Sequence, residues 1–234
     1  MFRPARLRHY LAVMRLRGFE TQAVLAGSGI DGRRMEEPSY LIGPDQYRSV
    51  VANILRLTGN KGIAFELGGR SEIADIGIVG YAMISSPTLN QALQLWIRYS
   101  RSLVGACWGV RLLDDEPEHF SVEVIEELPT AGGLAFCVEE FITMMQKIGG
   151  ALSGEAPTLQ RVLLPYSAPD YASMYETICN CPVQFSAGRM RITVPRRWAD
   201  LKLRTSEADK VRCGQKHFET LGVPFAVAVT ADGV

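Results

Sequence analysis

Residues 108–124 read WGVRLLDDEPEHFSVEV, and this stretch decides the fold class because the hydrophobic period changes here. Apolar residues occupy alternate positions on both sides of a polar run: Trp108, Val110, Leu112, Phe120, Val122 and Val124. A period of two is typical of strands with one buried face. Asp114 to Pro117 supplies a turn between the two halves. The stretch therefore predicts a β-hairpin.

The chain before this hairpin has a helical period. Pro44 suits the first position of a helix, and Gly59 suits the position just after its end. Between them the apolar residues recur at helical spacing. Further helices are predicted around residues 7–14, 21–25, 62–69 and 77–85 and from residue 88 onward.

After the hairpin, strands and helices mix. The pattern predicts a helix over residues 131–152, a strand over 160–164 and a helix over 169–178. Residues 183–185 and 190–194 are predicted to form a second hairpin around Ser186 to Gly188. The order is thus a helical N-terminal half followed by ββαβαββ, which predicts an α+β fold with a mainly antiparallel sheet and packed helices.

Composition excludes several classes of protein. The 234 residues are 47% hydrophobic and 21% charged, so disorder of the whole chain is not expected. Lys plus Arg and Asp plus Glu number 25 each, whereas a chain that binds DNA by itself would usually be basic. No apolar run approaches the ~20 residues of a membrane span. Five arginines precede Glu20, as in a transit peptide or in a helix that docks its apolar face and leaves its arginines in water.

The sequence carries no convincing catalytic or metal motif. Five scattered cysteines argue against a disulfide framework and favour a reducing cytoplasm, and three dispersed histidines follow no ligand spacing. GSGIDG at 27–32 lacks the preceding strand and the later acid of a dinucleotide site. Adjacent carboxylates such as Glu139 and Glu140 are expected in solvent. We predict no catalytic residue, no metal and no cofactor.

Aromatic residues are the better candidates for a site. Six of them lie on segments that are predicted to pack together, and Arg70 and Arg98 could bind a ligand carboxylate, as could Arg101. The aromatic residues are Tyr81, Trp96, Tyr99, Trp108, Phe136 and Tyr166. A pocket of apolar and aromatic groups with a few polar ones is typical of small-molecule binding. The alternative is that the aromatics are core residues and the arginines lie on helix surfaces.

Residues 77–93, GIVGYAMISSPTLNQAL, resemble a catalytic loop at first sight. Pro87 disfavours helical geometry at the residue before it, so the first helix should end near Ser85. Thr88 and Gln91 have the spacing of a capping box for the next helix, with Leu89, Leu93, Trp96, Ser100 and Leu103 on its inward face. The hydroxyl groups then mark the end of one helix and the start of the next, and the stretch is a joint between two helices.

Several stretches together resemble the N-terminal, arabinose-binding type domain of AraC-type bacterial transcription regulators, in the subgroup that includes regulators of ornithine and other amino-acid catabolism. The shared features occur in one order over roughly residues 15–215. They are VLAGSGI at 24–30, the Gln46 helix with Asn53, FELGGR at 65–70, the stretch 77–99, PYSAPDYASMYETICNCPVQFSAGRMRI at 165–192, and the Trp198 to Leu203 region.

The resemblance implies a cytoplasmic domain that binds a small-molecule effector and forms a homodimer. We expect residues 1–204 to be this domain and residues 205–234 to be a linker helix and tail. They would lead to a C-terminal helix-turn-helix domain that this sequence lacks, and only that domain would contact DNA. Two alternatives remain open: an enzyme that uses the same aromatic pocket, and a dimerisation module without a ligand.

Overall fold

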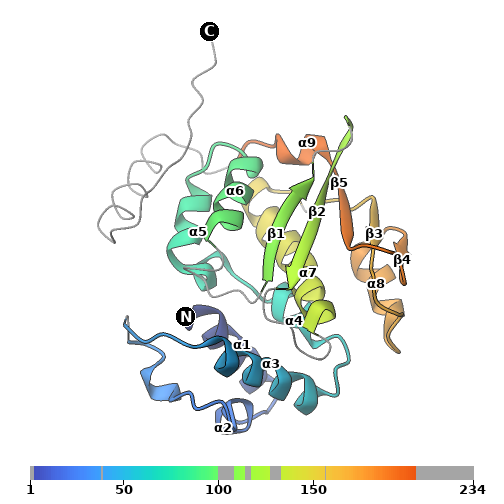
Figure 1. Cartoon of the computed structure of the whole chain (residues 1–234). Helices are drawn as coiled ribbons and strands as arrows, with labels where there is room; N and C mark the ends of the chain where they lie inside the picture. Colours follow the sequence, from blue (N-terminus) through green and yellow to red (C-terminus); the bar gives the residue numbers. More distant parts are fainter. Residues whose placement is uncertain are drawn as a thin grey trace.

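The computed structural model describes residues 3–37, 39–99, 108–113, 117–126, 133–155 and 157–203, and its first half is helical. The predicted joints at residues 58–62 and 85–88 separate successive helices in this half. The elements are α1 (Ala5–Leu16), α2 (Thr21–Leu25), the 3-10 helix η1 (Gly32–Arg34), α3 (Pro44–Thr58), α4 (Ile63–Gly69), the 3-10 helix η2 (Ile73–Ile76), α5 (Gly77–Ile84) and α6 (Leu89–Tyr99). In Figure 1, α1 to α3 lie at the end of the molecule away from α9.

The second half, as far as the structure describes it, combines a sheet with helices. Its elements are β1 (Trp108–Leu113), β2 (His119–Glu126), α7 (Gly133–Ser153), β3 (Arg161–Leu163), α8 (Ala172–Cys179), β4 (Val183–Gln184), β5 (Arg191–Pro195) and α9 (Arg196–Ala199). The predicted first hairpin is confirmed, because β1 and β2 pair antiparallel with Trp108 opposite Glu126. The α+β class and the mainly antiparallel sheet are confirmed as well.

The predicted second hairpin is wrong. The sheet order is β1-β2-β5-β3-β4, so β3 lies between β4 and β5. It pairs antiparallel with β5 and parallel with β4, through the crossover that α8 provides. The expected turn residues bond elsewhere: the Ser186 N–H donates to the Tyr166 carbonyl and the Ala187 N–H to the Leu164 carbonyl, at 2.9 and 2.8 Å. Ser186 supports this path with a positive φ of 53°.

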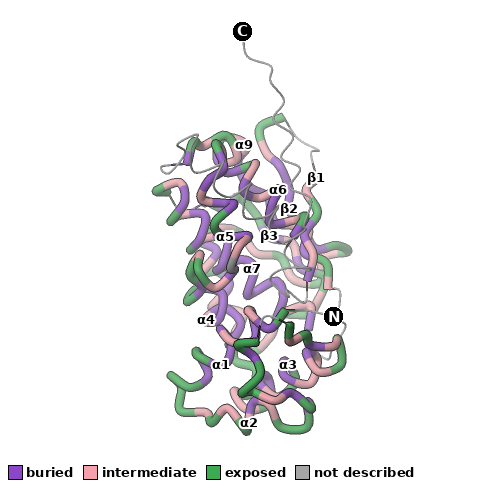
Figure 2. The backbone as a smooth tube through the Cα atoms, turned by 90° about the vertical axis from the view of Figure 1, so that its left-hand side faces the viewer, coloured by how far each residue is buried: buried purple, intermediate pink, exposed green. Residues whose placement is uncertain are grey.

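Helix α7 forms the centre of the core. Fourteen of its residues are buried, which is more than one face of a helix can supply. It packs against α4 on one side and against β2 and α6 on others. Figure 2 shows buried residues running along these central elements, with exposed residues toward the ends of the molecule. A long helix buried on most sides explains why two adjacent glutamates of α7 are also buried.

Helix α1 docks as predicted but with one exception. Leu7, Tyr10, Leu11 and Met14 are buried, as the helical spacing indicated. The arginines were expected in water, and for Arg6 this is wrong, since it is 1% exposed. Its position on α1 faces an anionic partner on α7, which sequence spacing alone cannot show.

The stretch 77–93 is a joint between two helices, as predicted. The Ser85 and Ser86 hydroxyls donate to the carbonyls of the preceding helical turn, and the Gln91 N–H donates to Thr88 Oγ1 at 3.4 Å. The reverse half of the capping box does not form, because Gln91 Oε1 is buried without a partner. Ser100, Arg101, Leu103 and the segment 205–234 lie outside the described residues, so the predictions on them stay predictions.

Candidate functional site

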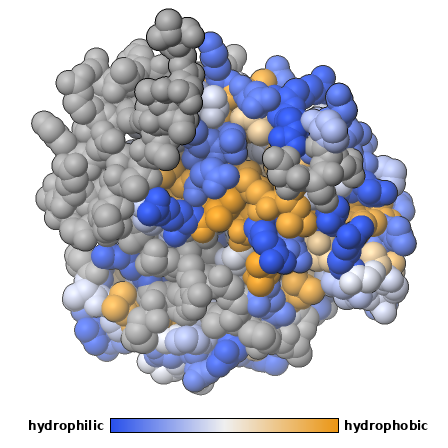
Figure 3. All heavy atoms as spheres, turned by 45° about the horizontal axis from the view of Figure 1, so that its top comes forward, coloured by the Kyte–Doolittle hydropathy of each residue, from blue (hydrophilic) through white to orange (hydrophobic). Residues whose placement is uncertain are grey.

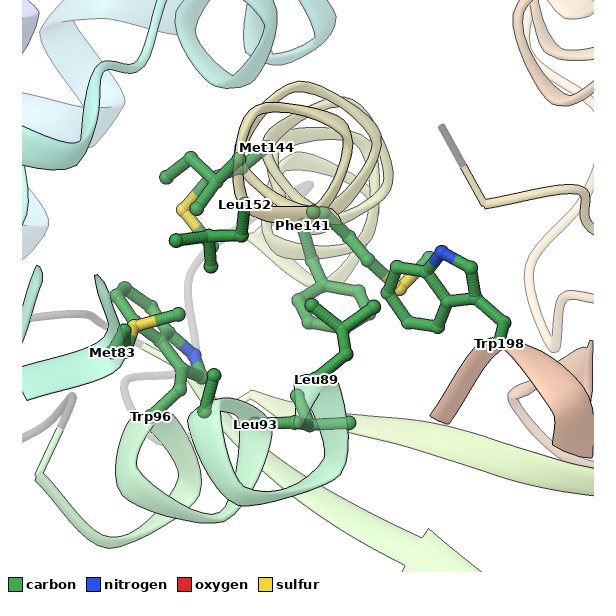
Figure 4. Close-up of a pocket in the computed structure, with 12 residues that line it drawn as sticks. Met83, Leu89, Leu93, Trp96, Phe141, Met144, Leu152 and Trp198 are labelled. Carbon is green, nitrogen blue, oxygen red and sulfur yellow. The ribbon is translucent and has the colours of Figure 1, made fainter. Parts of the chain in front are cut away.

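An apolar cavity of about 40 Å³ lies where α5, α6, α7 and α9 meet. Figure 4 shows its walls, with α6 on one side, α7 on the other and Trp198 of α9 between them. The lining residues are Met83, Leu89, Ala92, Leu93, Trp96, Phe141, Met144, Met145, Ile148, Gly149, Leu152 and Trp198. None of these twelve side chains is charged. Figure 3 brings this end of the molecule forward and shows hydrophobic residues gathered in the middle of the face.

Two of the residues that line the cavity are tryptophans. The indole nitrogens of Trp96 and Trp198 are buried, and neither has a hydrogen-bond partner. In Figure 4 the Trp96 nitrogen lies on the side of the ring that faces the space between α6 and α7. Trp198 instead turns its six-membered ring toward Phe141, with its nitrogen on the far edge. Because most buried polar groups are satisfied, an orphaned donor at a cavity is a feature to explain.

The segment that follows α9 is attached to the joint between α5 and α6. The Leu89 N–H donates to the Leu201 carbonyl at 3.0 Å, and the Leu203 N–H donates to the Pro87 carbonyl at 3.1 Å. Thr88 and Lys202 form an antiparallel bridge between these two bonds. The wall of the cavity is thus directly connected to residues 201–203, the last that the structure describes.

A second candidate is a groove of about 410 Å³ between α1, η1 and η2, and its walls are more polar. His9 Nε2 lies 2.8 Å from the Leu67 carbonyl and Nδ1 lies 3.1 Å from Asp75 Oδ2. Burial raises the pKa of Asp75, but the hydrogen bonds from His9 and the Glu72 backbone, together with the nearby basic groups, lower it by more. Arg8 donates to the Met35 carbonyl at 2.7 Å. These groups satisfy one another, so they do not indicate a missing ligand.

A buried ion pair joins α1 to α7. Arg6 Nε donates to Glu140 Oε1 at 2.7 Å, and Nη2 forms an ion pair with the same oxygen. The Tyr10 hydroxyl donates to Oε1 at 2.6 Å and the Trp108 indole donates to Oε2 at 2.7 Å. Burial lowers the pKa of Arg6, but Glu140, Tyr10 and Tyr47 together raise it by more, so the net shift is upward. The network ties α1 to α7 and β1 within the core.

Glu139, the neighbour of Glu140, is buried in a different environment. Its Oε1 accepts hydrogen bonds from the hydroxyls of Tyr175 and Tyr171 at 2.6 and 2.8 Å. Burial raises the pKa of Glu139 to about 7, although the two phenol hydrogen bonds oppose the shift. The prediction that Glu139 and Glu140 lie in solvent is therefore wrong. Adjacent positions on a helix that is covered on most sides can both be buried.

The eight residues proposed from the sequence do not gather in one place. Trp96 lines the cavity, whereas Trp108 and Phe136 belong to the buried core around Tyr10. Tyr99 is buried at the end of α6, and Tyr81 is 61% exposed on α5. Tyr166 lies in the Glu139 cluster, where its hydroxyl is 3.2 Å from that of Tyr175. Arg70 pairs with Glu66, and exposed Arg98 lies over the Tyr99 ring.

Sequence reasoning missed most of the cavity lining. Met83 on α5 and Met144 and Met145 on α7 indicate only core packing, and nothing local distinguishes them from other buried residues. Trp198 is different, because an aromatic residue in a short segment just after the last strand could have indicated a closing element. In the part of the chain that the structure describes, no three His, Cys, Asp or Glu residues could share a metal ion, and no helix could cross a membrane.

Comparisons with known proteins agree with this fold. The family model "Arabinose-binding domain of AraC transcription regulator, N-term" matches residues 18–203. The ornithine utilization regulator of Pseudomonas aeruginosa is 22% identical over 204 residues, which are 87% of this chain and 60% of that protein. An HTH-type transcriptional regulator of Mycobacterium tuberculosis is 31% identical over 104 residues, 41% of this chain and 30% of that one.

A solved structure extends the agreement to three dimensions. The transcriptional regulator CdpR from Pseudomonas aeruginosa superposes with a TM-score of 0.60 at 18% identity, over 89% of this chain and 59% of that one. The chain thus spans about three fifths of the length of these two Pseudomonas proteins. The matched family consists of sensor domains of regulators, not of enzymes. This chain belongs to the family of arabinose-binding type, N-terminal effector-binding domains of AraC transcription regulators.

Proposed function

We propose that the domain binds a small-molecule effector in the cavity between α6 and α7 and transmits its occupancy to a DNA-binding part of the same regulator. The observation that carries the proposal is the position of Trp198. Its side chain closes one wall of the cavity, while its backbone begins the segment that bonds to Pro87 and Leu89. The short helix α9 therefore contributes both to the wall of the cavity and to the chain that leaves the domain.

The transmission follows from the size of the cavity. About 40 Å³ is less than the ~150 Å³ that holds benzene in an apolar protein cavity, so an effector fits only if the walls move apart. A ligand shifts a conformational equilibrium only when it binds the two states unequally. Here it would favour a state in which Trp198 is displaced, and the Leu201 to Leu203 segment would move with it. DNA affinity would respond through that segment.

Dimerisation and a cytoplasmic location are part of the same proposal. They are supported by the family to which the domain belongs, whose relatives include HTH-type regulators. Sedimentation of the purified chain over a range of concentrations tests the homodimer. A purely monomeric chain at high concentration would contradict this part of the proposal. The small cavity volume favours one runner-up, a dimerisation module that binds no ligand.

A thermal-shift screen separates sensing from the runner-up. The compounds are amino acids including ornithine, hydroxy acids, aromatic acids, and neutral ketones and esters of similar size. The cavity is narrowed in Ala92→Leu, and Ala52→Leu on the exposed face of α3 is the matched control. We expect at least one compound to raise the melting temperature of the native chain and of A52L but not of A92L. If no compound stabilises the native chain, the ligand-free module is favoured.

A further inference from the structure

We infer that the effector of the α6–α7 cavity is an uncharged, mainly apolar molecule. Its single acceptor atom accepts a hydrogen bond from the indole N–H of Trp96. The inference rests on the proposed function, because it names the chemical class of ligand for the same cavity. Its evidence lies in the donor, in the absence of charge among the lining residues, and in the side chains that surround the space.

The donor comes first. An indole nitrogen can only donate, and Trp96 is 2% exposed with no partner for its N–H. A buried donor without a partner is costly, so a ligand acceptor that bonds to it recovers part of that free energy on binding. The nitrogen faces the space between α6 and α7 in Figure 4. A ligand oxygen placed there would satisfy it.

The lining argues against a charged ligand. Its twelve residues include no Lys, Arg, His, Asp or Glu. An isolated carboxylate or ammonium group is very costly in such surroundings, whereas a carbonyl or ether oxygen is tolerated once it is hydrogen-bonded. The buried carboxylates of the same helix, Glu139 and Glu140, are bonded to Tyr175 and to Arg6 and do not line the cavity. A zwitterionic amino acid does not suit this site.

The side chains around the space can adapt to an apolar body. Met83, Met144 and Met145 are unbranched and flexible, and methionine is well suited to fill gaps of variable shape. Their movement can enlarge the cavity without breaking a hydrogen bond. The cavity therefore accepts a compact apolar ring or short chain better than a polar ring such as a sugar. Most hydroxyl groups of a sugar would be buried there without a hydrogen-bond partner.

Three probes of matched size test the inference by titration calorimetry on the intact chain. Acetophenone has an apolar ring and one neutral acceptor, ethylbenzene lacks the acceptor, and benzoate carries a charge. A neutral hydrogen bond contributes about 0.5–1.5 kcal/mol, so we expect acetophenone to bind about twofold to twelvefold tighter than ethylbenzene. Benzoate should bind more weakly than either. Tightest binding by benzoate, or equal binding of acetophenone and ethylbenzene, would overturn the inference.

A variant assigns the preference to Trp96. In Trp96→Phe the apolar wall remains but the donor is lost, so acetophenone should lose its advantage and bind no more tightly than ethylbenzene. A preserved preference in W96F would refute the role of this residue. If W96F fails to fold, the ratio measured on the native chain decides alone. Failure of all three probes overturns the inference on ligand class, and the proposed function survives if a charged compound stabilises the native chain but not A92L.

Discussion

Gly68 and Gly69 are adjacent, yet the structure predicts opposite effects when each is replaced by alanine. Gly68 lies where α4 meets α7, and a Cβ added there would be 2.2 Å from the Glu140 carbonyl oxygen and 2.2 Å from Thr143 Oγ1. Gly69 is exposed, and its added Cβ would meet only Thr143 Cβ at 3.8 Å. Neither glycine has a positive φ, so backbone strain does not enter the comparison.

The magnitudes follow from these contacts. Ordinary contact begins at 3.4 Å, so Gly68→Ala requires α4 and α7 to separate by about 1 Å, since one of the two close atoms is backbone. Overpacking of this kind costs about 3 kcal/mol, at the upper end of the usual range. Gly69→Ala gains helix propensity, between zero and about 1 kcal/mol. We therefore expect the two variants to differ by about 3–4 kcal/mol.

Urea unfolding followed by far-UV circular dichroism measures this difference. G68A should unfold at a clearly lower urea concentration than the native chain, and G69A at an equal or higher one, with similar slopes. If G68A were as stable as G69A, the close approach of α4 to α7 would be wrong. The placement of Glu140 beside Arg6 would then lose its support.

Three other experiments test the buried polar groups. Arg6→Met and Glu140→Leu should each lower the free energy of unfolding by about 3–5 kcal/mol, because each leaves a lone buried charge. The double variant should lose less than the sum of the two, because it leaves an apolar pair. Additive losses in urea unfolding would contradict the pairing. The pKa of Glu139 is about 7 in the folded chain against 4.5 in the unfolded one, so its carboxyl opposes folding increasingly as pH rises through this window. Glu139→Gln should thus stabilise the chain at pH 8 by up to about 3 kcal/mol and have little effect at pH 5, and an equal effect at both values would refute the raised pKa. Burial raises the pKa of the Cys179 thiol to about 12, so iodoacetamide at pH 8 should label it only after unfolding, as peptide mass mapping can check; rapid labelling of the native chain would contradict its burial.

Local signals in the sequence were sufficient where an element is set by its own residues. Pro44 and Gly59 mark the ends of α3, since one has the φ of a first helical turn and the other adopts φ 69° at the C-cap. The alternation in β1 and β2 gave their pairing, because a short turn leaves one simple way to join them. The resemblance in several ordered stretches gave the family, which the family model then showed.

Long-range pairing was not accessible in the same way. β4 has two residues, too few to indicate from their pattern which strand they pair with. Nothing local therefore showed that β4 would pair with β3. Arg6 and Glu140 are 134 positions apart, and the local pattern around each predicts a charge on the surface. The cavity is lined by residues from four helices, and among the site residues proposed from the sequence only Trp96 lines it. Which apolar side chains border a space depends on helix packing, and periodicity fixes only the inward face.

The indole N–H resonance of Trp96 is the most direct test of the central claim. The chain has three tryptophans, so a ¹⁵N-labelled sample should give three indole signals, and W96F assigns the relevant one by its loss. We expect acetophenone to shift the Trp96 signal in a saturable manner and to leave that of Trp108 in place, because the Trp108 indole already donates to Glu140. A Trp96 signal that stays unmoved while acetophenone binds would show that the effector does not accept a hydrogen bond from this indole.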